Sequence, residues 1–246
     1  MLLLHGFTGS AASWPGTLVD GLASRERLPV LVDLPGHGAH AGDTDPAHFA
    51  LAPTLESLVR AQGPEPGPVV GYSMGGRLAL AFAVAHPRRV TRLVLESASP
   101  GLATEEERAA RREADETLAR RLETRGIEAF VDAWEELPLF ESQRALPPRI
   151  RAAQRARRLR NDPRSLAESL RGVGTGSLPS YWEALDRLSI PVLLLTGALD
   201  RKFTEIAREM ARRLPDVRHV VVPGAGHAVH LERPHAWLSA VCGFLA

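Results

Sequence analysis

The sequence is poor in cysteine and lysine and has no long hydrophobic run. Its one cysteine, Cys242, excludes an internal disulfide and is typical of a protein from a reducing compartment. Cys242 lies in the apolar stretch 240–245, so we expect it in the core. No apolar stretch has the length of a membrane span, and residues 1–4 are too short and uncharged for a signal peptide. We therefore expect a soluble, cytoplasmic protein.

Arginine supplies almost all of the positive charge, because Lys202 is the only lysine. The formal net charge is +1, which indicates neither a nucleic-acid partner nor an anionic membrane partner. The charge is uneven along the chain, since residues 142–171 hold nine arginines against one aspartate and one glutamate. A length of 246 residues fits one large domain with a substantial core.

Short apolar runs that end near glycine or an acidic residue recur along the chain. Helix-compatible segments such as 77–86 and 206–214 separate most of them. This alternation predicts βαβ units and a parallel sheet covered on both faces. The six predicted strands are residues 2–4, 30–33, 68–71, 92–96, 192–196 and 218–222.

The interval 100–180 breaks this pattern. It is rich in Glu, Arg and Ala, with leucines and aromatics at helical spacing and no convincing strand. An all-helical insertion in such a sheet predicts a cap above the carboxyl ends of the strands, where ligands bind. We expect Pro147-Pro148 to separate two cap helices. The predicted domains are therefore a core of residues 1–99 and 181–246 and a cap of residues 100–180.

The segment Gly71-Tyr72-Ser73-Met74-Gly75 follows an apolar strand and precedes a helical segment. Strand, sharp turn and helix is the context of the nucleophile elbow in the α/β-hydrolase fold, so Ser73 is the predicted catalytic serine. We predict that fold, with a mostly parallel sheet and the helical cap. Because the chain begins on the strand that leads to the oxyanion loop, we expect the sheet to lack the antiparallel hairpin that often precedes it.

A serine hydroxyl needs a base, and the base needs a carboxylate that fixes its tautomer. His227 follows the last predicted strand and Asp200 follows the fifth, which gives the chain order Ser, Asp, His of this fold. Glu96, at the end of the fourth strand, is the rival acid. His230 is interpreted as packing or capping the next turn. His40, His48, His86, His219 and His235 are interpreted as solvated or core residues.

His5-Gly6-Phe7 closes the first predicted strand. This position predicts that the backbone N–H groups of Phe7 and Met74 form the oxyanion hole. The Phe7 side chain could equally be plain pocket lining.

Further motifs run from one end of the chain to the other. The most specific are Arg77 directly after the elbow glycines, the arginines of the cap, and Trp134. On these motifs the chain resembles the SHCHC synthases, menaquinone-pathway enzymes of the α/β-hydrolase superfamily that eliminate pyruvate from a cyclohexene polycarboxylate. The matching segments are 4–9, 33–38, 71–77, 99–102, 166–171, 174–176, 200–203 and 225–227, with Trp14, Trp134, Phe140, Arg158 and His230.

The resemblance implies a role for each matching residue. It implies that Ser73, Asp200 and His227 are the catalytic triad and that the Phe7 and Met74 amides hold an oxyanion. It further implies a pocket in which three arginines hold substrate carboxylates and two aromatic residues line the wall. These residues are Arg77, Arg111 and Arg158, with Tyr72 and Trp134; Arg108 and Arg155 are the alternatives one helical turn away.

Arg77 also stands out on physical grounds. It lies in the first turn of a helix, where the helix dipole disfavours a cation, so a positive side chain there indicates an anionic ligand. The resemblance thus implies a carbon–oxygen lyase with a small anionic substrate and no cofactor. Two rivals remain, a serine hydrolase acting on an ester or thioester and a non-enzymatic binding module of the same fold.

Overall fold

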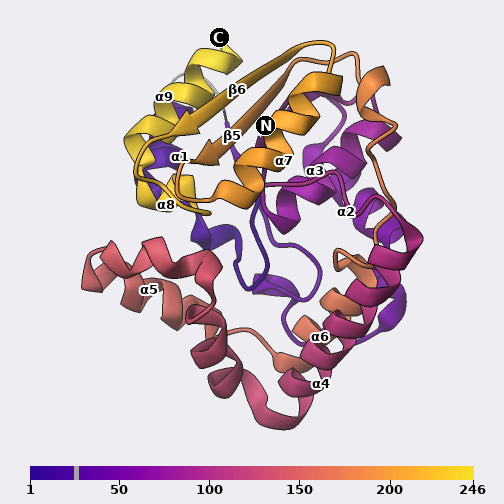
Figure 1. Ribbon diagram of the computed structural model, residues 1–246, viewed down its shortest axis with the longest axis vertical. Helices are drawn as coiled ribbons and strands as arrows, with labels where there is room; N and C mark the ends of the chain where they lie inside the picture. The colour runs from indigo at the N-terminus through magenta and orange to yellow at the C-terminus, as the bar shows by residue number, and fades with distance from the viewer. Residues whose placement is uncertain (25–27) are drawn as a thin grey trace.

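The alternation of short apolar strands and helices produces one six-stranded sheet (Figure 1). The computed structural model describes residues 1–24 and 28–246. The strand order is β2-β1-β3-β4-β5-β6, and every pairing among the described residues is parallel. The six predicted strands are confirmed, with ends that differ by at most two residues. They are β1 (Leu2–Leu4), β2 (Val30–Val32), β3 (Gly67–Tyr72), β4 (Val90–Glu96), β5 (Val192–Gly197) and β6 (Val217–Val222).

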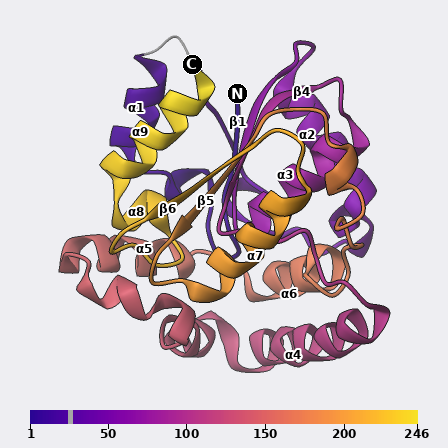
Figure 2. The ribbon, with the colours of Figure 1, turned by 45° about the horizontal axis from the view of Figure 1, so that its top comes forward.

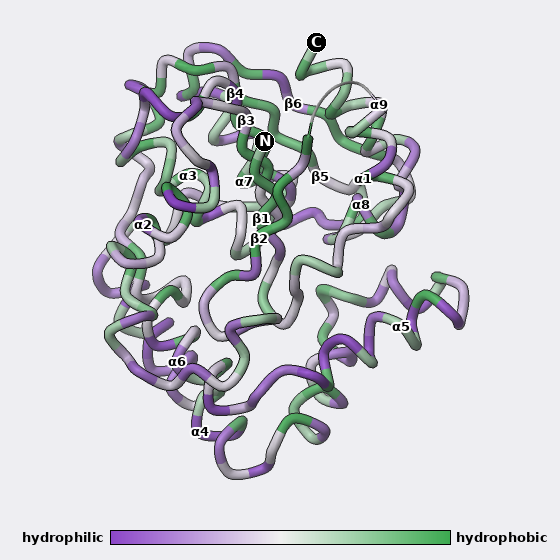
Figure 3. The backbone as a smooth tube through the Cα atoms, turned by 180° about the vertical axis from the view of Figure 1, so that it is seen from behind, coloured by the Kyte–Doolittle hydropathy of each residue, from purple (hydrophilic) through white to green (hydrophobic). Residues whose placement is uncertain are grey.

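Helices cover both faces of this sheet. The described helices of this part are α1 (Gly16–Ala23), α2 (Leu51–Gln62), α3 (Met74–Ala85), α7 (Arg201–Arg213), α8 (Val229–Glu232) and α9 (Pro234–Leu245). Successive strand residues point to opposite faces, so Val69 packs with α2, α3 and α7 while Val70 packs with α1 and α9. Cys242 is only partly buried, and it packs against the second of these clusters. Figure 3 shows the hydrophobic strands at the centre of the molecule.

Three further helices form a layer beside the sheet domain (Figure 2). They are α4 (Glu105–Glu135), α5 (Pro148–Arg158) and α6 (Pro163–Val173), and a 3-10 segment (Pro138–Ala145) precedes α5. A capping box between Thr104 and Glu107 starts α4, and Gly126, with φ of 78°, kinks it. The layer has its own apolar cluster, which includes Leu122, Phe130 and Leu166. The division into a core domain and a cap domain at residues 99/100 and 180/181 stays a prediction.

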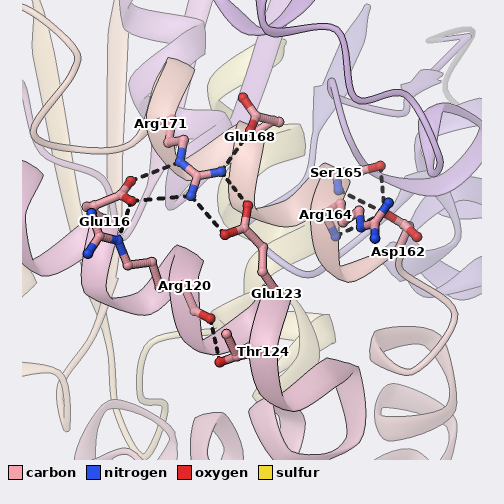
Figure 4. Close-up of polar contacts among 9 residues, drawn as sticks. All are labelled: Glu116, Arg120, Glu123, Thr124, Asp162, Arg164, Ser165, Glu168 and Arg171. Carbon is pink, nitrogen blue, oxygen red and sulfur yellow. Dashed lines mark hydrogen bonds and ion pairs between the residues drawn. The ribbon is translucent and has the colours of Figure 1, made fainter.

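Ion pairs add to this apolar contact between α4 and α6. Figure 4 shows Arg171 of α6 between Glu116 and Glu123 of α4, with Glu168 on its own helix. The Arg171 guanidinium lowers the pKa of Glu116 to about 2 by hydrogen bonding to it. Within the described residues no helix is long and apolar enough to cross a membrane.

Candidate active site

Ser73 lies on a strained turn between β3 and α3. Its backbone has φ of 52° and ψ of −109°, a conformation that costs about 1–3 kcal/mol and persists only where the surroundings enforce it. A side chain at Gly71 would collide with the Gly75 carbonyl, and one at Gly75 would collide with the Leu4 carbonyl. The Ser73 amide donates to the Glu96 carbonyl at 2.9 Å. The turn therefore holds the serine at the carboxyl ends of the strands.

The structure brings Ser73, His227 and Asp200 together. Nε2 of His227 lies 3.0 Å from Oγ of Ser73, and Nδ1 lies 2.7 Å from Oδ2 of Asp200. His227 is 1% exposed and Asp200 is 8% exposed, so the chain of contacts is nearly closed to water. Asp200 is also the N-cap of α7 and accepts from the Phe203 amide at 3.3 Å. This geometry allows His227 to take the Ser73 proton while Asp200 keeps the proton of Nδ1 in place.

The Phe7 and Met74 amides lie at the same end of the sheet. Neither N–H group has a hydrogen-bond partner among the described residues. Gly6 lies against Ser73, since a side chain there would approach Cβ of Ser73 at 3.5 Å. Phe7 and Met74 line the same cavity as Ser73, so their N–H groups are available to an oxygen beside the serine.

Two buried histidines that the sequence analysis did not single out hold the Phe7 loop. His37 Nε2 accepts from the Thr8 amide at 3.2 Å, and His5 Nε2 accepts from the Leu34 amide at 3.1 Å. Burial lowers the pKa of His5 to about 4 and that of His37 to about 3, so both act as neutral acceptors. In the sequence, the one feature that these two histidines share is a position directly before a glycine in the loop after a strand.

Arg77 is a cation without a partner beside this centre. Its guanidinium makes no ion pair within residues 1–24 and 28–246, and its buried Nε has no hydrogen-bond partner. Burial, and then the nearby Arg111, lower the pKa of Arg77 to about 10, against the opposing effect of Asp115. The side chain therefore stays positive at neutral pH and lines the cavity that contains Ser73.

The other predicted arginines differ in how far the protein neutralises them. Arg111 donates Nε to Asp115 at 2.8 Å, and Arg158 donates to Glu135 at 2.8 Å and lies over the Phe140 ring. Both line the cavity. The alternatives Arg108 and Arg155 do not line it, and they form ion pairs with Glu105 and with Asp132 and Glu135.

Arg157 also lines the cavity, although sequence reasoning missed it. It has no ion pair within the described part of the chain, and burial followed by the charges of Arg158 and Arg160 lowers its pKa. A shift of one or two positions along α5 changes whether an arginine faces the cavity. The sequence does not show which positions face it.

The cavity has a volume of about 600 Å³, enough for a small molecule. Tyr72 and Trp134 are among the residues that line it. Trp134 contacts the Phe7 ring edge to face at 5.5 Å, and Tyr72 lies 5.4 Å from the His227 ring. No group of three or more His, Cys, Asp or Glu residues that could hold a metal ion occurs among the residues that the structure describes.

Glu96, the rival acid, makes different contacts. It accepts from Nδ1 of His230 at 2.8 Å and from Nε1 of Trp237 at 2.8 Å, whereas the carboxylate bonded to His227 is that of Asp200. His230 is 5% exposed and also lines the cavity.

Comparisons with known proteins show the family and the fold of the chain. Residues 1–241 match the alpha/beta hydrolase family. The chain is 42% identical to a putative 2-succinyl-6-hydroxy-2,4-cyclohexadiene-1-carboxylate synthase of Bacillus subtilis, over 100% of this chain and 89% of the relative. It superposes on the structure of MenH from S. aureus with a TM-score of 0.91 at 33% identity, covering 99% and 92% of the two chains. A malate-bound thermophilic esterase from Thermogutta terrifontis gives a TM-score of 0.81 at 28% identity, covering 99% and 88%.

Proposed function

Because the chain belongs to the alpha/beta hydrolase family, and within it to the 2-succinyl-6-hydroxy-2,4-cyclohexadiene-1-carboxylate (SHCHC) synthases, we propose that it is a carbon–oxygen lyase of menaquinone biosynthesis. In this proposal it eliminates pyruvate from an anionic cyclohexene polycarboxylate and needs no cofactor. The catalytic residues are Ser73, His227 and Asp200.

One observation carries the choice of an anionic substrate. Arg77 is a partly buried cation that makes no ion pair with any residue that the structure describes, and it lines the cavity of Ser73. Burial of an unpaired charge is costly, so a site that keeps one is suited to a ligand of opposite charge. A guanidinium also matches a carboxylate with two parallel hydrogen bonds. Arg111, Arg157 and Arg158 add positive charge from the helices α4 and α5.

The reaction follows from the contacts of Ser73. Nε2 of His227 takes the hydroxyl proton, and the Ser73 oxygen then removes a proton from the substrate ring. The electron pair of that C–H bond forms a ring double bond, and the C–O bond to the enolpyruvyl group breaks. The leaving pyruvate enolate takes the C–O electron pair and receives on carbon the proton held by His227. The Phe7 and Met74 amides stabilise the charge that develops on the ketone oxygen of the succinyl substituent when the ring proton is removed.

The remaining parts of the proposal concern the surroundings of the site. Residues 100–180 form a cap over it, and Tyr72 and Trp134 provide its aromatic wall. The partner is a small anionic substrate, with no nucleic-acid or membrane partner, and the compartment is the cytoplasm.

The test is a direct comparison of two activities of the purified protein. Pyruvate release from the menaquinone precursor is measured by coupling to lactate dehydrogenase, and hydrolysis of p-nitrophenyl acetate is measured on the same preparation. We expect a kcat/KM for pyruvate release of at least 10⁴ M⁻¹s⁻¹, about the lower end for enzymes on their own substrates. Fast ester hydrolysis without pyruvate release would overturn the proposal.

The second candidate function is that of a serine hydrolase. The same Ser73–His227–Asp200 contacts serve nucleophilic attack on an ester or thioester, and the similarity to an esterase favours this reading. A neutral ester, however, leaves Arg77 without a partner. A burst of p-nitrophenol equal to the enzyme concentration would indicate an acyl-enzyme and support the hydrolase.

A further inference from the structure

The site contains a second buried imidazole–carboxylate pair that the proposed reaction does not use. Nδ1 of His230 lies 2.8 Å from Oε1 of Glu96, and the His230 amide donates to the same oxygen at 3.0 Å. Glu96 is 0% exposed, and its other oxygen accepts from Nε1 of Trp237. Glu96 thus receives three N–H donors at the end of β4.

These contacts indicate which nitrogen of the His230 ring carries the proton and which carries the lone pair. Because a carboxylate only accepts hydrogen bonds, the proton of the neutral imidazole is on Nδ1, and Nε2 carries the lone pair. Nε2 makes no hydrogen bond with any residue in the described part of the chain, although the side chain is nearly buried. Nε2 is not one of the fully enclosed unpaired atoms of the described residues, and His230 lines the cavity, so this lone pair is available to a ligand there.

His230 faces the same cavity as Ser73 but from the other side of the sheet. It lies on α8, between the rings of Trp14 at 4.9 Å and Tyr72 at 4.7 Å, which belong to the apolar cluster of α1 and α9. Arg77 belongs to α3, on the opposite face. Arg77 and His230 therefore line one cavity from helices on opposite faces of the sheet.

The chemistry of Nε2 selects the group that it binds. Arg77 and the cap arginines are donors, which suit carboxylates. A lone pair at His230 repels a carboxylate oxygen but accepts the hydrogen of a hydroxyl group. We infer that His230 is a substrate-binding residue whose Nε2 accepts a hydrogen bond from a hydroxyl group on the substrate ring. This inference rests on the proposed function for the identity of the ring.

Two substitutions separate binding from a merely structural role. In His230→Asn the side-chain amide keeps a donor near the position of Nδ1, so the contact to Glu96 is retained and Nε2 is removed. In His230→Gln the amide reaches the position of Nε2, and the contact to Glu96 is lost. Steady-state kinetics with the menaquinone precursor at pH 8 and thermal unfolding are measured for both variants.

We expect His230→Asn to weaken substrate binding and His230→Gln to lower thermal stability. His230→Asn should raise KM about three- to tenfold, the loss of one hydrogen bond, with kcat within about threefold and an unchanged Tm. His230→Gln should keep KM within about threefold while its Tm falls, because Glu96 loses a donor. An unchanged KM in a stable His230→Asn enzyme, or a KM that follows Tm in both variants, would overturn the inference.

A binding measurement on the wild-type protein covers the case in which no pyruvate is released and the proposed function fails. The probes are trans-2-hydroxycyclohexane-1-carboxylate and cyclohexanecarboxylate, which differ in one hydroxyl group. We expect calorimetry to show about three- to tenfold tighter binding of the hydroxy acid, and imidazole ¹⁵N NMR to show a shift of His230 Nε2 with the hydroxy acid alone. Equal affinities and equal shifts would reject the hydroxyl site, whatever the enzyme's activity.

Discussion

Single side chains around Ser73 differ mainly in whether the protein itself neutralises them. Arg111 is paired with Asp115 and Arg158 with Glu135, so each has a carboxylate even without a ligand. Arg77 has no carboxylate partner among the described residues, so its charge is available to an anion in the cavity. This difference ranks the arginines for mutation, because a paired arginine is also needed for the local structure.

Arg77→Ala should lose at least about tenfold in kcat/KM on the carboxylate-rich precursor, because one charge-assisted hydrogen bond contributes about 1.5–3 kcal/mol. Arg77→Lys keeps the charge but not the two-pronged geometry, so it should also lose activity. The assay is pyruvate release at pH 8, where the Arg77 guanidinium, with a pKa of about 10, is still charged.

Hydrolysis of p-nitrophenyl acetate by the same variants is the control. It should change less than about threefold, since a neutral ester has no anion for Arg77 to hold. Equal losses on both substrates would mean that Arg77 supports the turn at Ser73 and does not bind substrate.

Ser73→Ala should fold normally and lose about a thousandfold or more in kcat, as removal of a triad residue usually does. Folding is retained because alanine and serine tolerate the φ of 52° equally well. Pyruvate release and circular dichroism are measured on the same sample. Activity within tenfold of wild type would remove the serine hydroxyl from the mechanism.

At the scale of elements, the packing of α4 on α6 sets the position of the cap arginines. Arg171 is the cation shared by Glu116, Glu123 and Glu168 (Figure 4). Without Arg171, the three carboxylates would remain close together, and among the described residues only Arg120 would still form an ion pair with one of them, Glu116. The Arg171 ion pairs therefore join α4 and α6 in addition to their apolar contact.

Arg171→Met should lower the free energy of unfolding by about 1–2 kcal/mol, the sum of several partly exposed ion pairs. This corresponds to a fall in Tm of about 2–8 °C for a chain of this size, and the difference should shrink in 1 M NaCl. The matched control is Arg212→Met, which removes the exposed pair with Glu209 on α7 and should shift Tm by less than about 2 °C. A Tm unchanged in Arg171→Met would show that the network adds nothing to the apolar contact.

At the scale of the whole molecule, the buried neutral histidines couple stability to pH. Free histidine titrates near pH 6.5, whereas burial lowers the pKa of His5 to about 4 and that of His37 to about 3. Between pH 6.5 and the lowered pKa of each histidine, the imidazole is protonated in the unfolded chain but neutral in the folded chain. Their contribution to stability is therefore complete above pH 6.5 and is lost as the pH falls toward 4 and 3.

His37→Gln keeps an acceptor for the Thr8 amide but removes the titrating group. Urea unfolding at pH 7.5 and at pH 5.0 should show that wild type loses about 2 kcal/mol more than the variant on acidification, since each histidine contributes about 1.4 kcal/mol per pH unit. The same acid loss in both proteins would mean that His37 is already charged or exposed in the folded state.

The chain by itself determined the fold and the residues that meet at Ser73. Each strand carries its own apolar run, and the glycines around Ser73 mark a local turn that no other residue type permits. Asp200 and His227 lie on the loops that follow β5 and β6, and the carboxyl ends of parallel strands meet at one edge of a sheet. These signals are local, so a linear pattern is sufficient to find them.

Only the tertiary structure decided which buried polar groups have partners. Glu96 and His230 are 134 positions apart, and Thr8 and His37 are 29 apart, so no local pattern indicates that they touch. Likewise the sequence of α5 does not show which of its arginines face the cavity. The packing of α5 against α4 places Arg157 and Arg158 in the cavity and Arg155 outside it. Contacts between distant segments depend on how the elements pack, and packing turns one residue toward the ligand and its neighbour toward solvent.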